Sequence, residues 1–600
     1  MKKLIILTLA CALILSGCNA LEPVQTTNPS GETSGDPVDP NLHDTPAVNV
    51  DFEQNDEYLF SEADQKADYS ENNCAVITLS GNSVSSNAPT VLIDGTTATI
   101  TKEGDYILRG TLTDGSIVIN ANEKAKIRLI LEGADITSAT SAALNVISAK
   151  KVFVTLAQGT ENALSNGGSF AGAGEGIDGA VFCKSDLTIN GSGSLSVTSP
   201  AGHGIVCKDD LAITGGVISV HSASHALDAN DSVRIQNGEI TVDSGKDGVH
   251  VEDADKTDVG FVYMSGGKLN IESEGDGLSA ALHMQLSGGA IEILAGGGYE
   301  NGQQHSSGGW GDFMGGGMGP GGQRPPKPRA ATTTTEDVTS MKGLKAGTGL
   351  LINGGTIKIN SADDAVHSNA VAVINGGQIE IASGDDGIHA DTNLSVTNGT
   401  IKITQSYEGL EAKNIVLSGG DVSLVSTDDG LNAAGGVDGS GEGGRDQMNG
   451  GRPGAGSASD GSVTISGGKL YVKASGDGID ANGYLQITGG YTVVCGPNVG
   501  DTATLDYDVS GTITGGVFIG TGSSMMAQSF SKGSQGTLAV NAGNQAAGTT
   551  IKVTDSQGKE LLSYQPELAF TVFIYSAPEI VSGQTYQLVV GTAEGEITAA

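Results

Sequence analysis

One short phrase recurs through more than half of this 600-residue sequence. Its plainest copy is SGDDGIHA at residues 383–390, with near copies SADDAVHS at 361–368, STDDGLNA at 426–433 and ASGDGIDA at 474–481. The small fifth residue of the phrase returns about every 22 residues, a period typical of a solenoid of stacked repeats.

Each repeat contains three short stretches in which apolar and polar residues alternate, for example 388–390, 394–396 and 401–403. Alternation at period two predicts strands, and a Gly-rich turn lies between the second and third stretch. A single repeat cannot bury its apolar face, so repeats must stack. We therefore predict an all-β fold: a right-handed, single-stranded parallel β-helix of about 10 to 13 coils with three strands each.

The first strand of each repeat has its own pattern. The residue after the marker is always apolar and the residue two further on is small, so both are expected to point inward. The residue between them is mostly polar and includes His250, His367 and His389. We expect this column to face solvent and its histidines to be surface residues; a zinc site or a catalytic base is the alternative.

The N-terminus has the order of an export signal: Lys2 and Lys3, an apolar run, then the sequence LSGC ending at Cys18. LSGC resembles the lipobox of bacterial lipoproteins, which implies cleavage before Cys18 and lipidation of that cysteine. We expect an exported lipoprotein anchored by lipid at the bacterial cell surface. Ordinary signal cleavage beside a chance cysteine is the alternative.

The predicted domains follow from shifts in composition. Residues 1–17 are the signal peptide, 18–50 a disordered tether, 51–520 the β-helix and 521–600 a β-rich C-terminal cap. Gly-rich insertions interrupt the helix at about 296–340 and 435–460. A short polar N-terminal cap is expected over 51–70.

The formal net charge is −38. It argues against nucleic-acid binding, which needs Lys and Arg, and favours a cation partner. The alternative is an ordinary solvated acidic surface.

The column before the marker is acidic, and stacking places its members about 4.8 Å apart. Carboxylates at that spacing repel, and several corners carry two of them. The oxygen-rich arrangement favours Ca²⁺, although Asp-Gly also suits a tight turn. The predicted metal-binding residues are Asp363, Asp364, Asp385, Asp386, Glu408, Asp428, Asp429, Asp477 and Asp480.

Cys183 and Cys207 lie in the same column of consecutive repeats. An exported protein can join such a pair in a disulfide, and two free buried thiols fit equally well.

The segments LINGGTIKI (351–359) and GDDGIHA (384–390), with the ending GSSMMAQ (522–528), resemble clostridial calcium-binding, cellulose- and pectate-binding β-helix proteins. Their domain is described as a carbohydrate-binding domain, and the resemblance runs from about residue 51 to 600. It implies a parallel β-helix with bound calcium that binds acidic or cellulosic plant polysaccharides. It does not supply individual metal ligands.

Three functions remain open. The first is a non-catalytic, calcium-dependent, extracellular protein that binds polygalacturonate or cellulose. The second is a calcium-dependent polysaccharide lyase, which needs a basic residue near the metal; Lys342 and Lys345 flank the acidic column. The third is an adhesin or spacer solenoid. A monomer is expected in each case.

Overall fold

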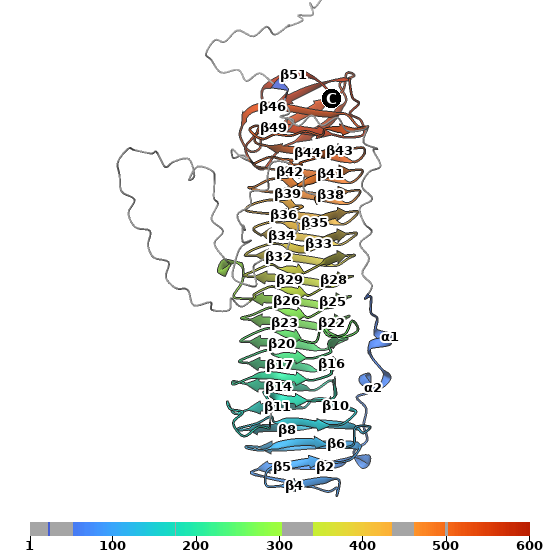
Figure 1. The fold of residues 1–600 in the computed structure, drawn as a ribbon, viewed down its shortest axis with the longest axis vertical. Helices are drawn as coiled ribbons and strands as arrows, with labels where there is room; N and C mark the ends of the chain where they lie inside the picture. Colours follow the sequence, from blue (N-terminus) through green and yellow to red (C-terminus); the bar gives the residue numbers. More distant parts are fainter. Residues whose placement is uncertain (1–21, 24–51, 175, 303–339, 435–460, 498–501) are drawn as a thin grey trace, which may run out of the picture.

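The computed structural model describes residues 22–23, 52–174, 176–302, 340–434, 461–497 and 502–600. Strands dominate these ranges, and 47 of them form one long sheet in which parallel pairing prevails. The all-β prediction is confirmed. Figure 1 shows the strands stacked into a tall column, with the N-terminal strands at one end and the C-terminal strands at the other.

Strands pair with their counterparts in the next repeat and form three parallel ladders. The first ladder contains β5 (Thr97–Ile100), β7 (Ser116–Asn120), β9 (Leu144–Ser148), β12 (Gly179–Cys183), β15 (His203–Cys207), β18 (Leu227–Ala229), β21 (Val249–Val251), β24 (Leu278–Ala280), β27 (Leu344–Ala346), β30 (Val366–Ser368), the start of β33 (Ile388–Val396) and of β35 (Leu410–Leu417), β37 (Leu431–Asn432) and β40 (Ile479–Asp480).

The second ladder contains β2 (Ala75–Gly81), β6 (Gly104–Leu112), β8 (Lys126–Ser138), β10 (Lys151–Leu156), β13 (Asp186–Gly191), β16 (Asp210–Ile213), β19 (Ser232–Ile235), β22 (Phe261–Met264), β25 (His283–Leu286), β28 (Gly349–Ile352), β31 (Val371–Ile374), the ends of β33 and β35, β38 (Gly461–Ile465), β41 (Gly483–Ile487), β43 (Ser510–Ile513) and β45 (Lys532–Gly533).

The third ladder contains the end of β8, β11 (Glu161–Asn166), β14 (Ser194–Ser199), β17 (Val217–Ser222), β20 (Glu239–Ser244), β23 (Lys268–Ser273), β26 (Ala290–Ala295), β29 (Thr356–Ser361), β32 (Gln378–Ser383), β34 (Thr400–Gln405), β36 (Asp421–Val425), β39 (Lys469–Lys473), β42 (Tyr491–Cys495) and β44 (Val517–Gly522).

The apolar columns predicted from the repeat lie in register. Ile357, Ile379 and Ile401 are direct partners in successive strands, and each is 2% exposed or less. One apolar cluster of such residues continues from Ile77 to Ile574. The stacked repeats therefore share a single core, which buries the face that one repeat alone would leave exposed.

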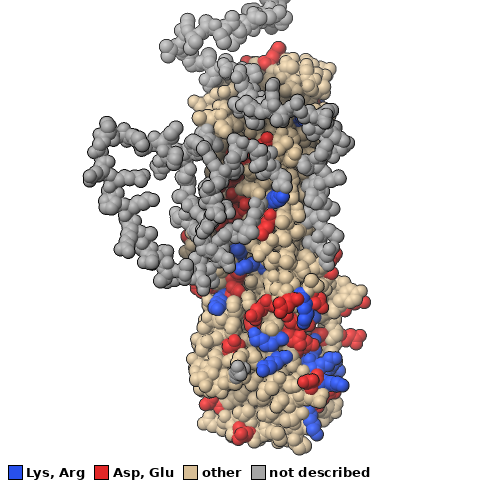
Figure 2. Space-filling view, viewed as in Figure 1, with Lys and Arg blue, Asp and Glu red and all other residues tan. Residues whose placement is uncertain are grey.

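The first residues before the sheet do not cap its end. Helices α1 (Asp56–Leu59), α2 (Glu62–Gln65) and η1 (Glu71–Asn73) lie beside the second ladder (Figure 1). Asp56 accepts a hydrogen bond from Tyr263, and Asp64 pairs with Lys151. The expected N-terminal cap is thus wrong: its polar side chains bind along the flank of the column. Figure 2 shows the acidic and basic side chains interspersed there.

Parallel pairing continues past the point where the sequence period fades, through β43 and β44. Antiparallel pairing then takes over, because β44 pairs with β49 (Phe570–Ser576), which also pairs with β46 (Thr537–Gln545). A separate four-stranded sheet follows the order β48 (Glu560–Tyr564), β47 (Ile551–Thr554), β50 (Thr585–Val590) and β51 (Ala593–Thr598).

A few short elements lie outside the ladders. They are β1 (Glu22–Pro23), which pairs with β46, the hairpin strands β3 (Ser83–Ser86) and β4 (Val91–Asp94), and η2 (Tyr299–Asn301). The predicted signal peptide, Cys18, nearly all of the tether and most of both Gly-rich insertions lie outside the described residues.

Candidate metal site along a polar seam

Two columns of polar side chains flank the marker glycine along the first ladder, and we call them together the polar seam. The column before the marker contains His203, His225, Asp247, Asp276, Lys342, Asp364, Asp386, Glu408, Asp429 and Asp477. The column after the marker contains Asp228, His250, Ser279, Lys345, His367, His389, Glu411, Asn432 and Asp480.

One oxygen of each seam aspartate that precedes a marker accepts a backbone N–H from the next repeat. Asp364 Oδ1 accepts from Asp386 N at 3.0 Å, and Asp386 Oδ1 accepts from Glu408 N at 3.2 Å. Asp429 Oδ1 does the same for Asp477 N at 2.5 Å. These aspartates therefore join consecutive turns, and each keeps a second oxygen for other partners.

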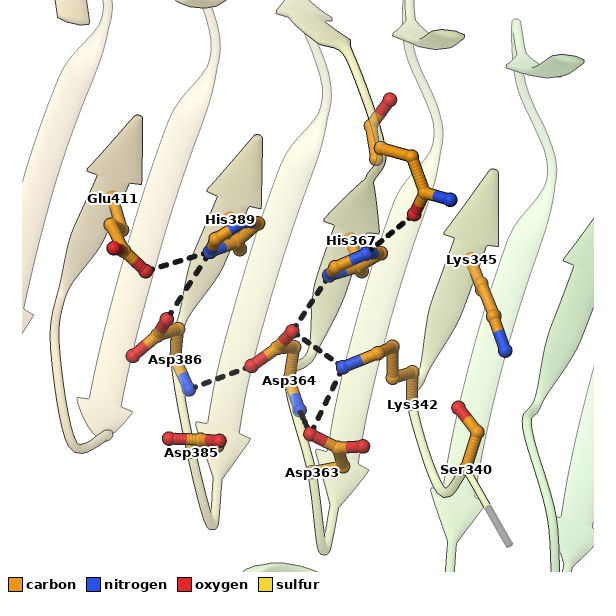
Figure 3. A network of polar contacts seen from close by, with 12 residues as sticks. Ser340, Lys342, Lys345, Asp363, Asp364, His367, Asp385, Asp386, His389 and Glu411 are labelled. Carbon is orange, nitrogen blue, oxygen red and sulfur yellow. Dashed lines mark hydrogen bonds and ion pairs between the residues drawn. The ribbon is translucent and has the colours of Figure 1, made fainter. Parts of the chain in front are cut away.

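In the N-terminal part of the seam, lysine binds that second oxygen (Figure 3). Lys342 Nζ lies 2.7 Å from Asp364 Oδ2 and 3.0 Å from Asp363 Oδ1, and Lys342 is only 2% exposed. Lys345 Nζ lies 3.2 Å from Asp276 Oδ2. The predicted repulsion is therefore relieved here by the protein's own cations.

Titration of the two neighbouring aspartates reflects this pairing. Burial acts to raise the pKa of Asp364, but the Lys342 ammonium and His367 hold it well below its ordinary value. Burial and the adjacent Asp364 carboxylate raise the pKa of Asp363 to about 6, against the opposing effect of Lys342. Asp385, the third carboxylate of this cluster, has an oxygen within 4.8 Å of theirs.

The prediction that His367 and His389 face solvent is wrong. They are 4% and 1% exposed, and their rings stack at a centroid distance of 4.9 Å. His389 Nδ1 lies 2.7 Å from Glu411 Oε2, and Nε2 lies 3.1 Å from Asp391 Oδ1. A strand that alternates in polarity can bury both faces when carboxylates satisfy the polar one.

His389 is held as a cation. Burial acts to lower its pKa, but hydrogen bonds to Asp386, Asp391 and Glu411 raise it well above the ordinary value. An imidazolium has no lone pair for a metal. The group Asp386, His389 and Glu411, although its ligand atoms lie within 4.8 Å of one another, is thus a poorer metal site than its composition indicates.

The balance of charges differs in the C-terminal part of the seam, which comprises Glu408, Asp429, Asp477 and Asp480. Ligand oxygens of Asp429, Asp477 and Asp480 lie within 4.8 Å of one another. Among the residues that the structure describes, no Lys, Arg or His forms an ion pair with any of the three. Burial first, and neighbouring carboxylates second, raise the pKa of Asp429 to about 8.

The pKa values of the other two carboxylates of this group, Asp477 and Asp480, are raised as well. Burial is the largest cause that raises the pKa of Asp477 to about 7 and that of Asp480 to about 6. Glu408 accepts from Asn432 Nδ2 at 3.0 Å through Oε1, while its Oε2 is buried and has no partner in the described ranges. Tyr407 forms a side-chain hydrogen bond with Asp428. Burial first, and this hydrogen bond second, raise the pKa of Tyr407. This cluster is the one whose donor set best fits Ca²⁺.

Sequence reasoning missed the roles of Lys342 and Glu411. The sequence predicts for Lys342 only the role of a base in a lyase, and it predicts no role for Glu411. Comparing the two seam columns across neighbouring repeats would have found both, because each lies one repeat from an oppositely charged side chain.

Cys183 and Cys207 are both fully buried and are free thiols. Cys183 Sγ donates to Ser185 O at 2.9 Å, and Cys207 Sγ to Asp210 O at 3.2 Å. Burial first, and the hydrogen bond with Cys183 second, raise the pKa of Cys207 well above its ordinary value. The structure thus describes two buried free thiols, and the alternative of a disulfide stays a prediction.

Within the described ranges, none of the short helices has the length and apolar character needed to cross a bilayer.

Comparisons with known proteins concern carbohydrate binding. A carbohydrate-binding domain-containing protein of Acetivibrio thermocellus is 36% identical over 124 residues, which are 20% of this chain and 43% of that protein, so less than half of the relative is spanned. A solved structure entitled "Structure of the polysaccharide lyase-like protein from C. thermocellum, Gadolinium derivative" is 30% identical, with a TM-score of 0.36, over 37% of this chain and 92% of the other.

A family model described as "Carbohydrate-binding domain-containing protein" matches residues 94–387 and 371–454. These two ranges overlap and together include more than half of the 600 residues. The chain therefore belongs to the family of carbohydrate-binding domain-containing proteins.

Proposed function

We propose that this protein is a non-catalytic, calcium-dependent polysaccharide-binding protein built as a right-handed parallel β-helix. Family membership supports carbohydrate binding. The observation that carries calcium is the group Asp429, Asp477 and Asp480, three half-buried carboxylates with no ion-pair partner among the described residues.

The β-helix is supported by constant register. Each ladder advances by one repeat, and the three ladders alternate along the chain in the same order from β9 to β42. Parallel strands joined in this way wind right-handed in nearly all proteins.

Calcium in this proposal binds to Asp429, Asp477 and Asp480, and its role is to neutralise charge. When bound, the ion offsets the burial and the repulsion that otherwise raise the pKa values of these carboxylates. It acts in the C-terminal part of the seam as Lys342 does in the N-terminal part. Asp363, Asp364 and Asp385 form a weaker candidate, because Lys342 already neutralises that cluster.

The ion pairs of Lys342 and Lys345 support a non-catalytic function. A lyase base must lose its proton, whereas Lys342 is enclosed by two carboxylates and Lys345 is paired with Asp276.

The proposal places the protein, as a monomer lipidated at Cys18, on the bacterial cell surface, where it binds polygalacturonate or cellulose.

The calcium test is thermal unfolding in EDTA and in excess Ca²⁺. Saturating a site at 100 times its Kd adds about 2.7 kcal/mol to the free energy of unfolding, so calcium is expected to raise the midpoint. Asp429→Asn/Asp477→Asn should lose this response, and the exposed control Asp421→Asn should keep it. Identical wild-type midpoints in EDTA and calcium contradict the calcium site.

The binding test is retention on immobilised polygalacturonate and on cellulose, with and without calcium. Retention on either polymer supports the proposal, and absence of retention on both favours a spacer. Release of unsaturated product from polygalacturonate, lost in Lys345→Ala, would instead establish a lyase.

A further inference from the structure

A shallow groove of about 760 Å³ runs along the turns between the second and third ladders. Its centre is formed by the first residues of successive third-ladder strands and the glycines before them. These are Gly355, Thr356, Gly377, Gln378, Gly399 and Thr400.

The floor of the groove is half-buried glycine backbone. Gly377 and Gly399 have φ values of +97° and +102°, which disfavour any side chain, and an added Cβ would meet neighbouring backbone atoms at 3.2 and 3.0 Å. The N–H groups of Gly377, Gly399 and Gly420 donate no hydrogen bond within the described part of the chain. These three backbone donors are therefore not used by the described residues.

The column of side chains in the groove is also unused. Thr356, Gln378 and Thr400 are exposed, and their side chains form no hydrogen bond to another described residue. Their polar groups are therefore available to a ligand at intervals of about 4.8 Å.

The columns on either side are satisfied internally. On the turn side, Asn375 Nδ2 donates to Asn353 Oδ1 at 3.0 Å and Thr397 Oγ1 donates to Asn375 Oδ1 at 2.8 Å. On the strand side, Lys402 Nζ lies 3.1 Å from Glu380 Oε1. The side chains of the groove column thus lack hydrogen-bond partners among the described residues, whereas those of the columns on either side have partners.

The chemistry of this stripe fits an uncharged polyhydroxyl chain. Gly355 to Gly468 spans four strand spacings, roughly 19 Å, which accommodates several sugar units. The centre has no charged side chain, and at its end Asp421 and Lys469 neutralise each other at 3.4 Å. A polyuronate would lose hydration here and gain no cation in return.

An aromatic ring follows the groove. Tyr491 is the ladder partner of Lys469 and is 45% exposed. Its ring gives an apolar face with a polar tip, which suits the C–H face of a pyranose. Polar stripe and ring lie in one line along the column.

We propose that this groove binds a neutral polysaccharide chain laid parallel to the column axis, with Tyr491 as a stacking platform. The proposal rests on the carbohydrate-binding function above and deepens it, because it assigns the binding surface and selects neutral glycans over polyuronates. The groove shares no residue with the proposed calcium site in the polar seam.

The test is affinity electrophoresis of the full chain in native gels that contain hydroxyethyl cellulose or polygalacturonate. Thr400→Trp fills the groove, and Val217→Trp, an exposed position in the same ladder, is the matched control. Gln378→Ala/Thr400→Ala removes two hydrogen-bonding groups and is expected to weaken binding about tenfold or more. Circular dichroism checks that each variant is folded.

We expect hydroxyethyl cellulose to retard the wild type and Val217→Trp, but not Thr400→Trp. If the wild type is retarded and Thr400→Trp is retarded equally, the groove assignment is wrong although carbohydrate binding stands. If polygalacturonate alone retards the wild type, the neutral class is wrong. If neither polymer retards the wild type, the proposed carbohydrate-binding function itself fails.

Discussion

The two parts of the polar seam face the same electrostatic problem and resolve it differently. In the N-terminal part, Lys342 and His389 lie among the carboxylates as built-in cations. In the C-terminal part, Asp429, Asp477 and Asp480 gather without a described cation, and their pKa values rise instead. The same backbone arrangement can therefore place a buried cation among the carboxylates in one repeat and leave them without a described cation a few repeats later.

The largest effect is expected from Lys342→Met. Removal of one partner leaves the buried Asp363 and Asp364 without their cation, and breaking a buried ion pair costs about 3 to 5 kcal/mol. Urea unfolding should show a loss of that size. A loss below about 1 kcal/mol would show that the lysine does not stabilise the N-terminal part.

The same substitution should have opposite signs in the two parts. Asp364→Asn removes a carboxylate that pairs with Lys342 and is expected to destabilise the protein. Asp429→Asn keeps an oxygen that accepts from Asp477 N but removes a repelling charge, so in EDTA it should stabilise by about 1 to 2 kcal/mol. Urea midpoints at pH 8 measure both, and equal signs would contradict the comparison.

The pH dependence should separate the parts as well. Folded Asp429 and Asp477, with pKa values of about 8 and 7, keep protons that the unfolded chain releases above its ordinary value of 3.8. The folded state thus binds more protons, and in EDTA the free energy of unfolding falls as pH rises from about 4 to 8. The proposed calcium ion would bind the ionised form, so its addition is expected to reduce this fall.

Asp364 in the N-terminal part contributes with the opposite sign. The pKa of Asp364 is depressed, so its stabilisation is present above the unfolded value and is lost as pH falls through the folded one. Urea midpoints from pH 4 to pH 8 test the trend of Asp429 and Asp477, and midpoints measured below pH 3.8 test that of Asp364. Asp429→Asn/Asp477→Asn should flatten the decline towards pH 8, and a decline unchanged in that variant would place its source elsewhere.

The smallest effect is expected from Lys358→Met. Its ammonium lies 3.2 Å from Glu292, but both side chains are about 60% exposed. Exposed pairs contribute about 0 to 1 kcal/mol. Thermal unfolding should therefore barely distinguish this variant from the wild type, which also makes it the control for Lys342→Met.

The sequence predicted what depends on period. The inward column of Ile388 and its counterparts is buried, and the strands stack in the expected register. It also indicated which carboxylates would gather, including Asp429 and Asp477. These features follow from local alternation repeated at fixed spacing.

The features that were missed depend on contacts between columns or between distant segments. Alternation placed His389 outside, but its burial depends on Glu411 one repeat away. Residues 52–73 have no period, and only tertiary partners such as Gln285 fix their path. A single repeat read by itself does not contain that information.

That path has a mechanical consequence. Stacked repeats contact mainly their neighbours, so such an array can fray one unit at a time. The segment from Gln54 to Glu71 lies along the N-terminal repeats of the column. Gln54 is bound by Gln285 at one end, and Glu71 by Arg109 at the other. Opening any repeat beneath this segment requires releasing its contacts, so we expect that stretch to unfold as one cooperative block.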